Sequence, residues 1–199
     1  MYTDLFKELS NILQNRPEFL SKIPDEYAEL RERLEALPEF EHIDLWHDQV
    51  NYLSEEHPFP TPAAFLEFNT MQVDDAGELI QTTNLQVDIH VFYETFSDTY
   101  EGAVMQEEAL NYLDLLLLVG LMFHGRNGTS FHQMRRTGTM REESGGAGNL
   151  YRISFETNIS EFSGLNLFST KEMADREIIL GNKISGGRTQ EASDRLYQL

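Results

Sequence analysis

Four residues crowded into seven positions are the first candidates for chemistry. His42, Asp44, His47 and Asp48 combine imidazole with carboxylate, and these groups bind transition metals. In an extended strand, successive side chains point to opposite faces, so His42 and Asp44 would share one face and His47 would lie on the other. Three ligands would converge only with a partner from elsewhere in the chain. We therefore favour a surface strand over a metal site here.

A second acid and imidazole pair, Asp88 and His90, lies on the polar side of an alternating strand, where the two groups could exchange a proton. We favour a solvated or cross-strand pair. No serine has a nucleophile-elbow context, and neither a His-Glu-x-x-His motif nor an acidic calcium loop is present. The glycines of segment 145–148 precede a strand, whereas a phosphate loop opens onto a helix. We expect no catalytic residue, no cofactor and no metal site.

Three arginines close together, Arg135, Arg136 and Arg141, could bind phosphate. The chain as a whole is acidic, with 15 Lys+Arg against 34 Asp+Glu and a net charge of −19, and no aromatic residues interleave with these arginines. Residues 1–125 hold 5 basic and 25 acidic side chains, and residues 126–199 hold 10 and 9, so the two parts carry −20 and +1. We expect the arginines to meet carboxylates of a neighbouring subunit.

Length and composition set further limits. A chain of 199 residues suits one domain with extensions. The absence of cysteine excludes disulfide scaffolds, thiolate zinc sites and cysteine nucleophiles. The longest strongly apolar stretch, 115–123, is about half of the roughly 20 residues that a bilayer requires. No apolar run follows the first residues, so we expect no signal peptide and a location in the cytosol.

The most informative stretch for the fold runs from Gln86 to Phe123. Alternation over residues 85–94 predicts a strand with one buried face. Residues 103–123 then predict a helix whose stripe comprises Val104, Met105, Ala109, Leu110, Leu113, Leu117, Leu121 and Met122. We predict that this stripe packs on the strand, with Val87, Ile89 and Val91 under Leu110, Leu113 and Leu117.

The remaining patterns surround this core. Helices are predicted from Thr3, as N-cap, to before Pro17, and from Pro24 to Leu37. Strands are predicted at 43–47, 63–73, 80–94, 131–141 and 150–159, with a turn at Asp74–Gly77 between the second and third. The expected fold is α+β: an antiparallel sheet of about four to five strands with helices packed on one face, plus a C-terminal arm. The core domain should cover 1–160 and the extension 161–199.

The extension combines a short apolar part with a polar end. Ser169 and Glu172 resemble a capping box, and residues 182–199 should be disordered in a monomer. We expect the arm from Leu165 to Leu199 to order against an adjoining subunit. Its candidate contact residues are Leu165, Leu167, Phe168, Ile178, Ile179 and Leu180.

Three runs carry a resemblance to a known family. They are 43–49 (Ile-Asp-Leu-Trp-His-Asp-Gln), 62–68 (Pro-Ala-Ala-Phe-Leu-Glu-Phe) and 86–92 (Gln-Val-Asp-Ile-His-Val-Phe), the last ahead of the long helix. Over about residues 40 to 160, the chain resembles the tail terminator and head-to-tail completion proteins of long-tailed bacteriophages. The paired N-terminal helices before Pro38 and the long C-terminal extension depart from that family's pattern.

The resemblance implies a structural virion protein, assembled in the host cytoplasm and without catalytic residues. It implies an α+β domain that forms a closed ring, usually of six copies, which caps the tail tube and joins it to the neck. The partners would be further copies of the chain and other tail tube and neck proteins, with DNA passing as non-specific cargo and no membrane involved. An acidic lumen suits such passage, because phosphate adhesion comes from lysine and arginine.

Two other interpretations remain open. The chain could be an acidic adaptor that presents carboxylate-rich helices to a basic partner. It could also be a small metal-dependent enzyme that uses His42, His47, Asp88 or His90, which we favour least.

Overall fold

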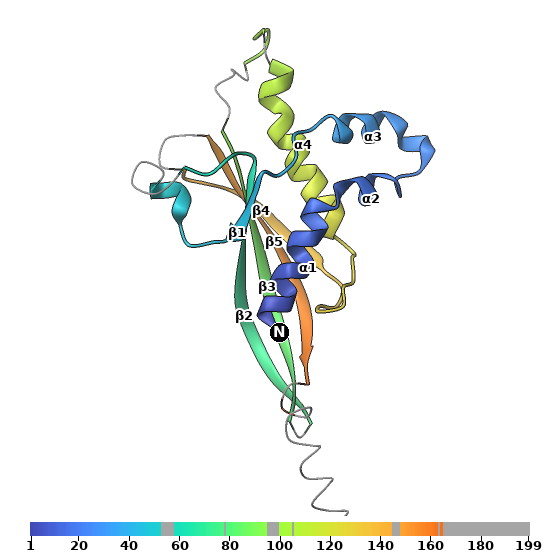
Figure 1. Cartoon of the computed structure of the whole chain (residues 1–199), viewed down its shortest axis with the longest axis vertical. Coiled ribbons are helices and arrows are strands. Elements are labelled where there is room, and N and C mark those ends of the chain that lie inside the picture. Colours follow the sequence, from blue (N-terminus) through green and yellow to red (C-terminus); the bar gives the residue numbers. More distant parts are fainter. Residues whose placement is uncertain are drawn as a thin grey trace, which may run out of the picture. The chain divides into compact units, whose positions relative to one another are not determined.

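The computed structural model describes residues 1–52, 58–77, 79–94, 100–104, 106–144, 148–162 and 164 (Figure 1). Its helical elements are α1 (Tyr2–Gln14), α2 (Arg16–Leu20), η1 (Asp25–Tyr27), α3 (Ala28–Glu35), η2 (Gln49–Tyr52) and α4 (Gln106–Phe123). Its strands are β1 (His42–Leu45), β2 (Ala63–Gly77), β3 (Ile80–Tyr93), β4 (Arg135–Glu142) and β5 (Asn149–Glu161). The predicted α+β class is confirmed.

The five strands form one mixed, mostly antiparallel sheet in the order β1-β2-β3-β5-β4. β5 and β4 pair antiparallel, with Leu150 opposite Glu142. β1 differs from the expectation of a wholly antiparallel sheet, because it runs parallel to β2, with His42 opposite Ala63. Parallel neighbours need a crossover, and residues 46–62 between these strands supply it.

Helices cover one face of the sheet through a single large apolar core. α1 contributes Leu5, Leu9, Ile12 and Leu13, which share one side at helical spacing. β3 contributes Leu85, Val87, Ile89 and Val91, so the predicted buried face of this strand is confirmed. Figure 1 shows α1 and α4 on the same side of the sheet. The core unites helices and strands that lie far apart in the sequence.

The predicted orientation of α4 is wrong for most of its stripe, although Ala109 and Met122 of that stripe are buried. The large apolar core includes Leu115, Leu116, Leu118, Val119, Met122 and Phe123 of α4. Leu113 and Leu121 from the predicted stripe are 45% and 41% exposed, and Leu117 is half-buried. Leucine occurs on every side of this helix, so spacing alone could not identify the side that meets the sheet.

The N-terminal helices differ from the prediction in their ends. α1 begins at Tyr2, with Met1 and not Thr3 in the cap position, and Pro17 lies inside α2 at a first-turn position. Leu34 and Leu37 are buried and Leu30 is half-buried, as their stripe predicted, whereas Tyr27 is 53% exposed.

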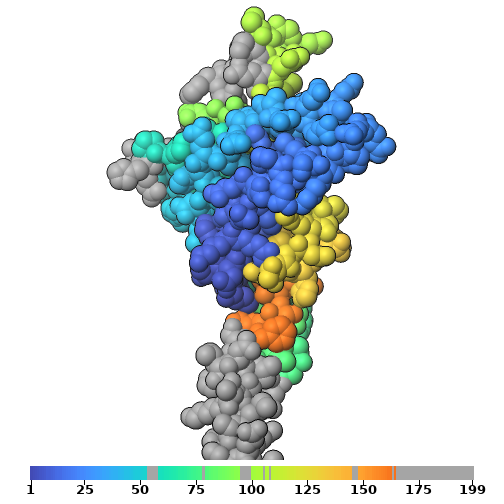
Figure 2. All heavy atoms as spheres, turned by 45° about the vertical axis from the view of Figure 1, so that its right-hand side comes forward, coloured from blue at the N-terminus to red at the C-terminus, as the bar shows by residue number. Residues whose placement is uncertain are grey.

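The loop after α4 is fastened to α1 by a carboxylate. Glu8 accepts hydrogen bonds from the backbone N–H groups of Thr129 and Ser130, at 2.7 and 2.8 Å. Figure 2 shows this loop, in yellow, lying against α1, in dark blue. Burial raises the pKa of Glu8, but these hydrogen bonds outweigh it and hold the pKa below 4.5.

The chain divides into two compact units. One comprises Met1–Val73 with Thr83–Ile159, and the other comprises Asp74–Thr82 with Ser160–Leu199. In the second unit, β2 continues to Gly77, so the predicted turn at 74–77 is displaced toward Leu79, which has a φ of 64°. The interface candidates Leu165, Leu167, Phe168, Ile178, Ile179 and Leu180, and the capping box, lie outside the described residues.

Candidate functional site

The three predicted arginines lie on β4, an edge strand of the sheet whose residues are exposed as far as Arg141. The Arg135 guanidinium forms an ion pair with Glu156 of the neighbouring strand, at 2.8 Å. Arg136 donates through Nη2 to the Thr139 hydroxyl at 2.6 Å. Arg141 is exposed and has no side-chain partner within the described part of the chain. Among the residues that the structure describes, two of the three arginines therefore lack a carboxylate partner.

A trough lies between β4 and the exposed side of α4. Its lining comprises Leu117, Gly120, Leu121, His124, Arg136, Thr137, Gly138 and Thr139, and it encloses about 420 Å³. Leu113 lies four residues before Leu117 on the same side of the helix and extends the apolar floor. The α4/β4 trough, as we call these residues with Arg141, is a solvent-accessible apolar strip beside a basic edge.

Arg136 is held close to α4. A Cβ at Gly120 would lie 2.8 Å from its Nη1 atom, so the absence of a side chain at Gly120 leaves room for the guanidinium. The Arg136 backbone N–H donates to Nδ1 of His124 at 3.1 Å. Farther along β4, the charge of Arg141 acts on Tyr112 of α4, although burial and the hydrogen bond with Tyr151 raise the pKa of Tyr112 above 10.0. The two arginines therefore lie beside different ends of the trough.

The outer side of α3 has the opposite charge. Glu29, Glu32 and Glu35 follow one another at three-residue spacing, and all three are exposed. Within the described part of the chain, none of these side chains has an ion-pair or hydrogen-bond partner. By contrast, Arg33 of the same helix pairs with Asp114 of α4 at 2.9 Å. We call Glu29, Glu32 and Glu35 the acidic stripe.

Of the two expectations for Asp88 and His90, solvation is wrong, whereas cross-strand contacts are present, because both residues contact side chains of β2. Their exposed fractions are 0% and 2%, and His90 pairs with other residues. Its Nδ1 lies 2.7 Å from Glu142 and its Nε2 lies 2.9 Å from Glu67. The imidazole therefore lies between two carboxylates, each within hydrogen-bond distance of one ring nitrogen.

Further groups fix this buried polar cluster. The Trp46 ring stacks on His90, with centroids 4.1 Å apart and planes 5° apart. Arg152 Nε lies 3.2 Å from Glu142, as an ion pair without hydrogen-bond alignment. Asp88 Oδ2 accepts from Gln86 at 2.8 Å and from Asn69 at 3.3 Å, whereas no donor among the described residues reaches Oδ1. Asp88 and His90 are buried within the sheet, whereas the side chains of Glu67, Glu142 and Arg152 are partly accessible to solvent.

The sequence offered partial signals for this cluster. Glu67 interrupts an apolar run in β2, and alternation places it on the same face as Phe65. Nothing local indicated that Glu142 or Arg152 would reach His90, because the contact between His90 and Glu142 joins residues 52 positions apart.

The first metal candidates do not converge. His42 Nε2 lies 3.8 Å from Asp44, as expected for side chains on one face, and His47 contacts the Leu45 carbonyl instead. Among the described residues, no group of three or more His, Cys, Asp or Glu could hold a metal ion.

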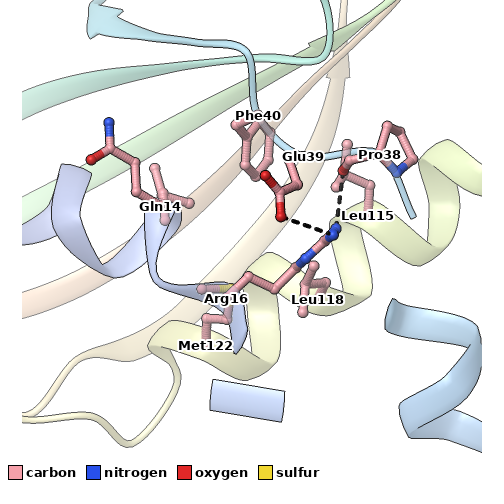
Figure 3. A pocket seen from close by; sticks show the side chains of 9 residues that line it. Gln14, Arg16, Pro38, Glu39, Phe40, Leu115, Leu118 and Met122 are labelled. Carbon is pink, nitrogen blue, oxygen red and sulfur yellow. Dashed lines mark hydrogen bonds and ion pairs between the residues drawn. The ribbon is translucent and has the colours of Figure 1, made fainter. Parts of the chain in front are cut away.

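A small cavity lies beside the helical core (Figure 3). It encloses about 120 Å³, whereas ligand pockets usually measure about 300 to 1,000 Å³. Arg16 spans its edge and donates to the carbonyls of Leu37 and Pro38 at 2.7 and 3.1 Å. Leu115, Leu118 and Met122 form its apolar side. This cavity is a gap in the packing, too small for a typical substrate.

No protein-family model matches the chain, and no curated protein is significantly similar to it in sequence. Among the described residues, no helix is both long and apolar enough to cross a bilayer.

Proposed function

We propose that the protein is a structural component of the tail or neck of a long-tailed bacteriophage, where copies form a ring that caps the tail tube and joins it to the connector. Closed rings arise when one surface of a subunit binds a different surface of the next. The observation that carries the proposal is the separation of charge on one copy: an acidic stripe on α3 and a basic edge on β4.

The acidity of the chain also supports this function. A protein of net charge −19 repels phosphate, so DNA can move past it without adhering. The arginines of β4 would be neutralised within subunit contacts and would not retain DNA. Around the ring, tail tube and neck proteins would be the remaining partners.

The test is to measure the assembly state of the full chain. Native mass spectrometry and negative-stain images should give rings of about six copies with a central opening. A full chain that stays monomeric at high concentration, with tail tube and neck proteins also absent from its complexes, would contradict the proposal.

The second candidate is an acidic adaptor, and the acidic stripe on α3 favours it, since three adjacent carboxylates are free to meet a basic partner. An adaptor should be a monomer that binds a basic protein with an affinity that falls as salt is added.

A further inference from the structure

We infer that the α4/β4 trough of one copy is the docking site for the acidic stripe on α3 of a second copy. The inference rests on the self-association in the proposed function and identifies the two surfaces that would meet.

The floor of the trough is apolar and partly exposed, and the methylene groups of incoming glutamate side chains could lie along it. Leu113, Leu117 and Leu121 follow one another at four-residue spacing, which gives a continuous ridge about 12 Å long on α4. Ridges of this kind pack into the grooves of another helix. Exposed leucines at 45% and 41% lose solvent contact when a helix lies along them.

The rim of the trough needs anions. Arg136 and Arg141 have no carboxylate partner among the described residues, although the chain carries more than twice as many acidic as basic groups. Their guanidinium groups lie beside an apolar floor, where an incoming carboxylate would be partly shielded from water. Such pairing orients a partner and accelerates association more than it adds affinity.

The acidic stripe needs cations. Like charges three residues apart destabilise an isolated helix, so Glu29, Glu32 and Glu35 repel one another. The same helix uses Arg33 to hold Asp114 in its own copy, which fixes α3 on α4 and leaves the stripe facing outward. A second copy's arginines would relieve the repulsion.

The dimensions of the two surfaces agree. Arg136 and Arg141 lie opposite Phe155 and Tyr151, which are four positions apart on β5, so the two arginines are about 14 Å apart along the strand. The acidic stripe spans about 9 Å along its helix, and glutamate and arginine side chains can bridge the remainder. A single helix can therefore lie on the leucine ridge while its carboxylates meet both arginines.

The edge of β4 is less suited to adding a strand. Its pairing with β5 shifts register between Arg136 and Gly138, and such bulges protect edge strands from pairing with another chain. A helix that docks beside the strand needs no free backbone ladder.

The experiment is a charge swap in the full chain, read by sedimentation and native mass at matched concentration. The trough variant carries Arg136→Glu and Arg141→Glu, and the stripe variant carries Glu29→Arg and Glu32→Arg. We expect each double variant to raise the dissociation constant of self-association at least tenfold. In the chain with all four changes, the dissociation constant should return to within about threefold of the wild-type value. Lys7→Glu on α1 is the control for added negative charge and should change little.

An apolar pair of variants separates docking from general charge effects. Leu121→Ser should weaken association, whereas Met71→Ser, also at an exposed residue, should not. Circular dichroism should show all variants folded, because the changed side chains are exposed.

Three outcomes would overturn the inference. Rings unchanged in every variant would reject it and leave the proposed function standing. Loss of assembly in both double variants without recovery in the combined chain would show that the stripe and trough have other partners. A wild-type chain that remains monomeric would reject both the inference and the proposed ring.

Discussion

The two faces of the sheet solve the problem of burial by different means. On the helix-covered face, β3 packs Val87, Ile89 and Val91 against helices in an apolar core. On the opposite face, the same strand buries Asp88 and His90 within a cluster of charged and hydrogen-bonding side chains, beside a second, smaller apolar cluster that includes Phe92, Phe65 and Leu150. The apolar side tolerates changes that keep volume, whereas the polar side depends on each partner being present.

This comparison explains why alternation in β3 was informative for only one face. A polar residue in alternation usually faces water, because burying a charge without a partner is costly. Here Glu67 and Glu142 supply the partners for His90 from two other strands. A strand with polar residues on one side can therefore be buried on both sides.

The largest expected effect is on the apolar face. Leu118→Ala should lower the free energy of unfolding by about 2 to 5 kcal/mol, because it removes buried methyl groups and enlarges the cavity that Leu118 lines. The matched control is Leu113→Ala, because the Leu113 side chain is 45% exposed. This change should lower the free energy of unfolding by less than about 1 kcal/mol. Urea denaturation measures both. Equal losses would mean that α4 presents a different side to the sheet.

The next effect tests the polar face. His90→Phe keeps a ring for Trp46 but leaves Glu67 and Glu142 without their shared donor, so we expect a loss of about 2 to 3 kcal/mol. Trp46 is the single tryptophan, so its fluorescence reports the cluster directly. His47→Phe at an exposed position should cost under about 0.5 kcal/mol. A His90→Phe variant as stable as the wild type would show that the contacts of His90 with Glu67 and Glu142 make no net contribution to the free energy of unfolding.

A smaller effect tests the hydrogen bonds between Glu8 of α1 and the loop after α4. Glu8→Gln should cost about 1 kcal/mol at neutral pH, because an amide accepts more weakly from the Thr129 and Ser130 N–H groups. Folding lowers the pKa of Glu8 from its ordinary value of 4.5. The carboxylate therefore stabilises the fold fully above pH 4.5, and this stabilisation is lost as the pH falls through the pKa of the folded state. The difference between the two proteins should shrink in acid. A constant difference across pH would argue against this contact.

The smallest effect concerns Asp88. Asp88→Asn removes a fully buried charge whose Oδ1 has no hydrogen-bond donor among the described residues, so stability should change by less than about 1 kcal/mol or rise. Thermal unfolding measures this change. A loss of several kcal/mol would indicate that the carboxylate of Asp88 is needed to accept the hydrogen bonds of Gln86 and Asn69.

Periodicity in the sequence determined the kinds of element and most of their positions. The buried side of α1 follows from leucine and isoleucine at helical spacing, and the inner face of β3 follows from aliphatic residues at every second position. These patterns are local, because each residue's direction depends on its own helix or strand. They sufficed for the α+β class and for the long helix after β3.

Tertiary structure alone decided which surfaces of these elements meet. Leucines surround α4, so only the fit to the sheet selected Leu115 and Leu118 for the core and left Leu113 and Leu121 exposed. The parallel pairing of β1, and the contact of His90 with Glu67 and Glu142, likewise join distant parts of the chain. Spacing in a sequence records the direction of a side chain within its own element, whereas its partners depend on how the elements pack together.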